Sequence, residues 1–113
     1  MYVNWDFLKE IADADASFQS ELVQEFCEQA TALGERIKDA VEALDAEALH
    51  SAAHSLKGSA ASVGAEDLTK AAANLDDRAR EGDFEGALER LSALLDSLHG
   101  TIHEMKAWIK QAA

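Results

Sequence analysis

The sequence predicts an all-α protein, an up-down antiparallel four-helix bundle with a short N-terminal cap helix. Apolar residues recur at intervals of three and four through almost the whole chain, which is the spacing of amphipathic helices. No stretch shows the sustained alternation or β-branched enrichment that strands require, and proline is absent. The 113 residues can build one hydrophobic core but not two ordinary ones, so residues 1–113 are expected to form a single domain.

A short helix is expected to begin after Asn4 as its N-cap and to cover one end of the bundle. Its apolar residues are Trp5, Leu8, Ile11 and Ala12, and an acidic break follows at residues 13–15. The next helix is predicted over residues 17–44. Its apolar stripe consists of Phe18, Leu22, Phe26, Ala30, Leu33, Ile37, Val41 and Leu44.

The two middle helices have clear boundaries. Asp45 is a natural N-cap for the first of them, and Gly64 suits the residue just past its C-terminus. Its inward residues are predicted to be Leu49, Ala53, Leu56, Ala60 and Val63. The second begins near Glu66 and stops near Gly82. Its inward residues are predicted to be Leu68, Ala72, Leu75 and Ala79.

The last helix has the most regular pattern, and Asp83 is its predicted N-cap. Its seam alternates steps of four and three, as in antiparallel bundles: Phe84, Leu88, Leu91, Leu95, Leu98, Ile102, Met105 and Ile109. Because short loops join long helices, neighbouring helices must run antiparallel. One bundle uses all the seam residues, so we expect a monomer, although the leucine-rich last helix leaves dimerisation open.

Composition excludes several classes of function. The formal net charge of −12 would repel a phosphate backbone, so nucleic acid is not an expected partner. The longest apolar runs are far shorter than the roughly 20 residues that cross a bilayer, so no membrane association is expected. The single cysteine, Cys27, excludes an internal disulfide and is expected to be a packed thiol. No secretory leader is recognisable, which favours the cytoplasm.

One face of the third predicted helix carries residues suited to chemistry. At 100° per residue, His50, His54, Gly58 and Ala61 fall on its outer flank, so His54 should face water. Lys57 lies three residues further on and can reach across the turn. A neutral imidazole is a competent nucleophile near neutral pH if one ring nitrogen is held as a hydrogen-bond donor.

Gly58 is unexpected inside a helix, where glycine costs about 1 kcal/mol relative to alanine. The missing side chain could let a partner or a phosphoryl group approach His54 closely. It could equally allow close packing against a neighbouring helix. The spacing alone leaves both interpretations open.

Asp76 is the candidate acceptor for the ring N–H of His54. If the third and fourth helices form a hairpin at Gly64, His54 lies ~15 Å and Asp76 ~18 Å from the turn, at similar height. The alternative is that Asp76 is a solvated acid beside Asp77. Lys57 could neutralise charge on a transferring phosphoryl group.

The segment from His54 to Ala65 reads HSLKGSAASVGA and resembles the signature of histidine phosphotransfer domains. In that family a His, a Lys, a Gly, a small residue and a later Gly keep this spacing. Leu68, Leu75 and residues 79–83 resemble the family's fourth helix and the turn after it. The resemblance covers nearly the whole chain. One position departs from the family, because Asp76 stands where Glu or Gln is usual.

The resemblance implies that His54 is phosphorylated, that Lys57 stabilises the phosphoryl group, and that Gly58 admits a receiver domain. His50, Gly58 and Ala61 would form the docking face. The partners would be receiver domains of response regulators or hybrid histidine kinases, with the phosphoryl group taken from one phospho-aspartate and passed to another. No nucleotide-binding motif is present, so we expect a phosphocarrier rather than an enzyme, without a cofactor and with Mg²⁺ on the partner. The alternative is a helical adaptor that binds receivers without being phosphorylated.

A metal site is the other alternative considered. His50 and His54 stand four residues apart, as do His99 and His103, and either pair could chelate from a helix face. Glu47 and Glu104 are nearby, but neither pair has further ligands in a recognised zinc pattern. No metal site is therefore expected.

Overall fold

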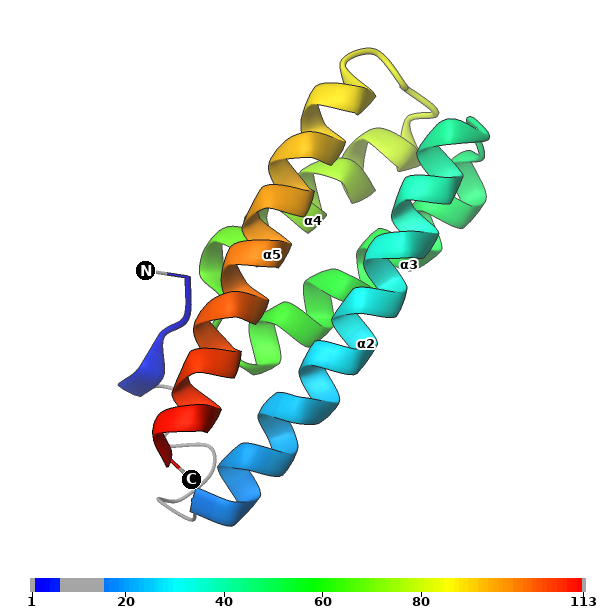
Figure 1. The fold of residues 1–113 in the computed structure, drawn as a ribbon. Helices are drawn as coiled ribbons and strands as arrows, with labels where there is room; N and C mark the ends of the chain where they lie inside the picture. The colour runs from blue at the N-terminus through cyan, green and yellow to red at the C-terminus, as the bar shows by residue number, and fades with distance from the viewer. Residues whose placement is uncertain (1, 7–15, 113) are drawn as a thin grey trace.

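The computed structural model describes residues 2–6 and 16–112 and contains four long helices within them. These are α2 (Ala16–Glu42), α3 (Ala46–Ser62), α4 (Glu66–Arg80) and α5 (Ala87–Ala112). Consecutive helices run antiparallel in a bundle of about 43 × 20 × 20 Å (Figure 1). Both α2 and α4 pack against α3 and α5, so the helices form a closed ring around one core. The predicted all-α, up-down bundle is confirmed, and the described residues contain no strand.

The core is apolar and draws on all four helices. Its largest fully buried apolar side chains are Val23, Ile37, Leu49, Leu56, Val63, Leu68, Leu75, Leu94 and Met105. Every inward residue predicted for α3 and α4 is buried. Burying each large aliphatic side chain stabilises the fold by roughly 1.5–3 kcal/mol, so these faces fix how α3 and α4 meet.

The boundaries of α3 and α4 follow the sequence closely. Asp45 caps α3, and its side chain accepts a hydrogen bond from the Ala48 N–H at 3.0 Å. Gly64 follows α3 with φ +73°, and Gly82 follows α4 with φ +67°. Both glycines occupy the left-handed region that a Schellman helix end requires, as predicted.

The end of α2 differs from the prediction. The helix stops at Glu42, and Leu44 takes the left-handed conformation with φ +53°. The Asp45 N–H then bonds the Ala40 carbonyl at 2.9 Å, so this is the same type of helix end with leucine in the glycine position. Leu44 is 67% exposed and does not belong to the inward stripe.

The predicted apolar stripe of α2 is also wrong at the N-terminal end of the helix. Phe18 is 48% exposed, whereas Gln19 and Val23 are buried. Three successive steps of four residues, from position 18 to position 30, rotate the side chains by about 120° in total. A stripe that continues to Val41 therefore cannot include Phe18.

The start of α5 is a further correction. Asp83 does not cap the helix, which begins at Ala87. The Asp83 carboxylate instead accepts hydrogen bonds from the Glu85 backbone N–H at 2.9 Å and from Arg78 at 3.0 Å, which lower its pKa. Leu88 is 70% exposed and lies outside the seam. Further along the helix, Leu91, Leu98 and Met105 are buried and Leu95, Ile102 and Ile109 are partly buried, as predicted, and Leu94 and Thr101 are buried as well.

The N-terminal residues pack beside the C-terminal half of α5 (Figure 1). The Glu104 carboxylate accepts hydrogen bonds from the backbone N–H groups of Tyr2 at 2.8 Å and Val3 at 3.0 Å. It also accepts one from the Trp5 indole at 3.2 Å. The Trp5 ring stacks on Trp108 with ring centroids 5.2 Å apart. Residues 2–6 are therefore attached to α5 by charge-assisted hydrogen bonds and an aromatic contact.

The same segment reaches the turn between α3 and α4, where the Asn4 N–H bonds the Gly64 carbonyl at 2.9 Å. Residues 5–6 are helical, so the helix expected after Asn4 starts at the predicted place. The other parts of that prediction, Leu8, Ile11, Ala12 and the acidic break at 13–15, lie outside the described residues.

Cys27 is buried in the core, as predicted, and burial raises the pKa of its thiol. In the part of the chain that the structure describes, no helix combines the length and apolarity needed to cross a membrane.

Candidate functional site

The candidate site lies on the exposed face of α3, next to α4. Leu56 and Ala60 turn the opposite face of α3 into the core, which directs His54 outward. The His54 side chain is 58% exposed, so the predicted orientation toward water is confirmed. Gly58 and Ala61 are exposed in the next turn, also as predicted.

Asp76 of α4 lies directly beneath this face. It is fully buried, at 0% exposure, so the interpretation of Asp76 as a solvated acid is wrong. Its Oδ2 atom lies 3.5 Å from Nδ1 of His54. The two side chains therefore meet as the helix rise predicted, at the outer limit of hydrogen-bond distance.

The structure gives His50 a contact that sequence reasoning missed. His50 was expected on the docking face or as a solvated neighbour. Its side chain is 41% exposed, and its Nδ1 also donates a hydrogen bond to Oδ1 of Asp76. The imidazole rings of His50 and His54 lie side by side, with centroids 5.8 Å apart. One buried carboxylate thus faces two histidines from successive turns of α3.

Two cations complete the surroundings of Asp76. Nζ of Lys57 lies 3.8 Å and Nη2 of Arg80 lies 3.5 Å from Oδ2. Sequence reasoning named Lys57 but missed Arg80. Because Asp76 and Arg80 stand four residues apart on α4, this spacing could have identified the pair.

These contacts control the charge of Asp76. Burial by itself raises the pKa of the carboxyl, but the His50 hydrogen bond and the positive charge of Arg80 lower it, with smaller contributions from the His50 charge and from His54. The net effect is a pKa below the ordinary value, so Asp76 is ionised at neutral pH. With Lys57 and Arg80 beside one carboxylate, the site carries a local positive excess in a chain of net charge −12.

The structure decides between the two interpretations of Gly58. A Cβ atom at this position would meet nothing within 4 Å. Close packing against a neighbouring helix therefore does not explain the glycine. The surface beside His54 is open.

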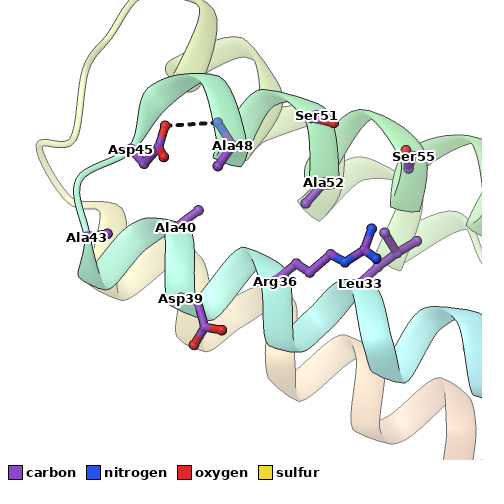
Figure 2. Close-up of a pocket in the computed structure, with 10 residues that line it drawn as sticks. All are labelled: Leu33, Arg36, Asp39, Ala40, Ala43, Asp45, Ala48, Ser51, Ala52 and Ser55. Carbon is purple, nitrogen blue, oxygen red and sulfur yellow. Dashed lines mark hydrogen bonds between the residues drawn. The ribbon is translucent and has the colours of Figure 1, made fainter.

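A groove of about 390 Å³ lies on the other flank of α3, between α2 and α3 (Figure 2). Arg36 of α2 and Ser51 and Ser55 of α3 are among the residues that line it. His54 and Asp76 do not line this groove. The candidate site is separate from this groove and lies on the exposed face of α3.

No group of three or more His, Cys, Asp or Glu side chains is arranged to hold a metal ion within residues 2–6 and 16–112. His99 and His103 are exposed on α5. Glu104, the acid beside His103, accepts hydrogen bonds from Tyr2, Val3 and Trp5 of the N-terminal segment.

The fold and the site define a helical bundle of the histidine phosphotransfer type, with a surface histidine above a buried carboxylate. The sequence profile of the Hpt domain matches residues 21–108, which is most of the chain. The chain therefore belongs to the Hpt domain family.

Individual relatives agree with this assignment. The phosphorelay protein LuxU of Vibrio vulnificus is 42% identical over 55 residues, in strains YJ016 and CMCP6. This match covers 49% of the present chain and 48% of LuxU, so it spans about half the length of these curated relatives.

Two solved structures share the fold. Histidine-containing phosphotransfer protein B of Pseudomonas aeruginosa PAO1 superposes with a TM-score of 0.91 at 21% identity, over 97% of this chain and 96% of that protein. The HPT domain of a sensor hybrid histidine kinase from Shewanella gives a TM-score of 0.84 at 20% identity, over 97% and 95% of the two chains. At these identities the similarity establishes the bundle and not the activity.

Proposed function

We propose that this chain is a phosphocarrier of a two-component phosphorelay. In this proposal His54 accepts a phosphoryl group from the phospho-aspartate of one receiver domain and passes it to another. The observation that carries the proposal is the placement of His54, whose exposed ring turns Nδ1 toward the buried carboxylate of Asp76 at 3.5 Å. Membership of the Hpt domain family supports it.

In this proposal Nε2 of His54 is the reacting atom. Because Nδ1 faces Asp76, the proton of the neutral ring is favoured there and the lone pair on Nε2 is free to attack. A bond forms between Nε2 and phosphorus while the bond from phosphorus to the receiver's aspartyl oxygen breaks. The aspartate leaves as a carboxylate with the electron pair. The ring gains positive charge, which the ionised Asp76 stabilises.

The remaining residues assist without reacting. Lys57 and Arg80 offset charge on the phosphoryl oxygens, because both cations lie within 4 Å of Oδ2, the carboxylate oxygen that faces His54. Gly58 and Ala61 leave space for the receiver. The donor phosphate and the Mg²⁺ then belong to the receiver, and this chain acts as a carrier and not as an enzyme. We further propose that it works as a monomer in the cytoplasm.

The test is transfer from radiolabelled receivers. A panel of receiver domains, each labelled on its aspartate, is mixed with the unaltered chain and with His54→Ala, Lys57→Ala and His103→Ala variants. We expect acid-labile label on the unaltered chain and on His103→Ala, the matched control with an exposed histidine on α5. His54→Ala should take up none, and Lys57→Ala should be slowed at least about tenfold.

Two outcomes would contradict the proposal. Label that persists in His54→Ala would place the acceptor elsewhere. Binding to receivers without any labelling of the unaltered chain would identify a docking adaptor instead.

A further inference from the structure

The two oxygens of Asp76 have different surroundings. Oδ1 accepts the hydrogen bond from His50. Oδ2 faces His54, Lys57 and Arg80 at 3.5–3.8 Å. Among the described residues, Oδ2 has no partner within full hydrogen-bond geometry although it is buried. The oxygen that faces the proposed phosphoacceptor is therefore the one that the fold leaves incompletely bonded.

An aspartate side chain does not fix the plane of its own carboxylate, since the terminal torsion is broad. At position 76 the hydrogen bond from His50 supplies the constraint. With Oδ1 held by a ring on the preceding turn of α3, Oδ2 can only point along α3 toward His54. His50 and His54 stand four residues apart on one face, so their Nδ1 atoms meet the two oxygens of one carboxylate.

We propose that His50 is a positioning residue that acts through Asp76. It holds the carboxylate so that Oδ2 faces Nδ1 of His54, which keeps the proton on Nδ1 and the lone pair on Nε2. This inference rests on the proposed phosphoacceptor role of His54. A glutamate at position 76 would carry its carboxylate one methylene further from the backbone of α4, away from the position that the His50 hydrogen bond fixes, so its contact with His54 would not depend on His50.

His50 is less suited to accept the phosphoryl group itself. Its Nδ1 also faces Asp76, but Lys57 and Arg80 are placed at Oδ2, on the His54 side. A phosphoryl group on His50 would lack these cations. The test below treats this alternative as an outcome.

A double-mutant cycle separates positioning from a general structural role. Transfer rates are measured for His50→Ala in the unaltered chain and in an Asp76→Glu background. We expect a loss of about tenfold in the first case and less than about twofold in the second, because glutamate reaches His54 unaided. His50→Asn, whose amide nitrogen can replace Nδ1 as donor to Oδ1, should restore most of the rate. An equal loss in both backgrounds would overturn the inference.

A second measurement needs no receiver and stays informative if Asp76→Glu folds poorly. The ¹⁵N shifts of the imidazole nitrogens report which nitrogen of His54 carries the proton. We expect the Nδ1–H form to dominate in the unaltered chain and in His50→Asn, and to lose population in His50→Ala. His99→Ala is the control and should leave His54 unchanged.

The outcomes distinguish failure of this inference from failure of the proposed function. An unchanged His54 tautomer in His50→Ala would overturn the positioning role even if transfer occurs. A shift of the His54 tautomer in His50→Ala, with no phosphoryl label on the unaltered chain or on any variant, would support the positioning role and refute phosphotransfer. Label that remains in His54→Ala and disappears in the His50→Ala/His54→Ala double variant would make His50 an acceptor and overturn both.

Discussion

At the scale of single residues, the buried charge of Asp76 joins α4 to α3. A carboxylate at 0% exposure is stable only with compensating partners, and here they come from His50, His54, Lys57 and Arg80. Four of the polar side chains at the site therefore depend on one acid. The arrangement makes Asp76 both a structural contact and the proposed electrostatic support of His54.

This burial predicts a pH dependence of stability. The folded state lowers the pKa of Asp76 below its ordinary value of 3.8. The ionised carboxylate therefore stabilises the fold above that value, and the stabilisation is lost as the pH falls through the lower folded pKa. Urea unfolding between about pH 5 and pH 3 should show a steeper loss of stability for the unaltered chain than for Asp76→Asn.

The matched control for this measurement is Asp77→Asn, since Asp77 is the exposed neighbour on α4. Its stability should fall with pH in parallel with that of the unaltered chain. If the stability of Asp76→Asn also falls with decreasing pH in parallel with that of the unaltered chain, the Asp76 contacts do not favour the ionised form.

Gly58 predicts opposite effects on stability and transfer. Because a Cβ atom would meet nothing within 4 Å, Gly58→Ala should gain about 1 kcal/mol from helix propensity alone. If the open surface admits a receiver, the same change should slow phosphotransfer. Thermal unfolding and transfer from a labelled receiver measure the two effects.

The comparison variant is Ser92→Ala on the exposed surface of α5, which packs against α2 and α4 and lies across the bundle from α3. It should also raise stability slightly and leave transfer unchanged. If Gly58→Ala transfers at the unaltered rate, the space beside His54 is not needed by the partner.

At the scale of elements, three helices end in the same way but with different residues. Gly64 and Gly82 occupy the left-handed position after α3 and α4, and Leu44 occupies it after α2. A left-handed conformation costs an ordinary L-residue roughly 1–2 kcal/mol, which glycine avoids. The hydrogen bond from the Asp45 N–H to Ala40 and the packing of α2 on α3 hold this turn in place regardless.

We therefore expect Leu44→Asn to stabilise the protein by about 0.5–1 kcal/mol, because asparagine tolerates the left-handed region better than leucine. Little apolar burial is lost, since Leu44 is 67% exposed. Denaturant unfolding gives the measurement. Leu88→Asn, at a leucine of similar exposure in a regular helix, should give no gain, and an equal gain there would attribute the effect to removing an exposed leucine.

The same elements explain which boundaries the sequence predicts. The limits of α3 and α4 were predictable because Asp45, Gly64 and Gly82 are strong start and stop residues. The end of α2 was not, because Leu44 gives no such indication. The predicted start of α5 was wrong. Aspartate is a preferred N-cap residue, but the Asp83 carboxylate instead accepts hydrogen bonds from Arg78 and Glu85 in the turn before the helix.

The candidate site, like the helix boundaries, was predictable only in part. His54, Lys57 and Gly58 follow from the periodicity of α3, and the rise per residue brings Asp76 to the same height. Helix rise does not reveal how far α4 is rotated about its own axis. The burial of Asp76 and its contacts with His50 and Arg80 depend on that rotation, so they required the structure.

At the scale of the whole molecule, the surface is mostly acidic and the His54 site is locally basic. A net charge of −12 is spread over a bundle about 20 Å thick, while Lys57 and Arg80 gather around the His54 face. Acidic side chains on the rest of the surface repel one another in the folded state more than in the expanded unfolded chain. The ion pair between Arg78 and Asp83 is partly exposed, and pairs of this kind contribute little.

Repulsion among the acids should therefore make the fold more stable as salt is added. The Debye length is about 10 Å at 0.1 M ionic strength, shorter than the bundle, so salt screens distant acids before it weakens close contacts such as those of Asp76. The midpoint of thermal unfolding should rise by several degrees between about 10 mM and 300 mM NaCl. A Glu25→Gln/Glu35→Gln variant, which removes two exposed acids of α2, should start from a higher midpoint and gain less from salt. A midpoint that falls with salt would instead mean that attractive pairs around Asp76 and Asp83 outweigh the net charge.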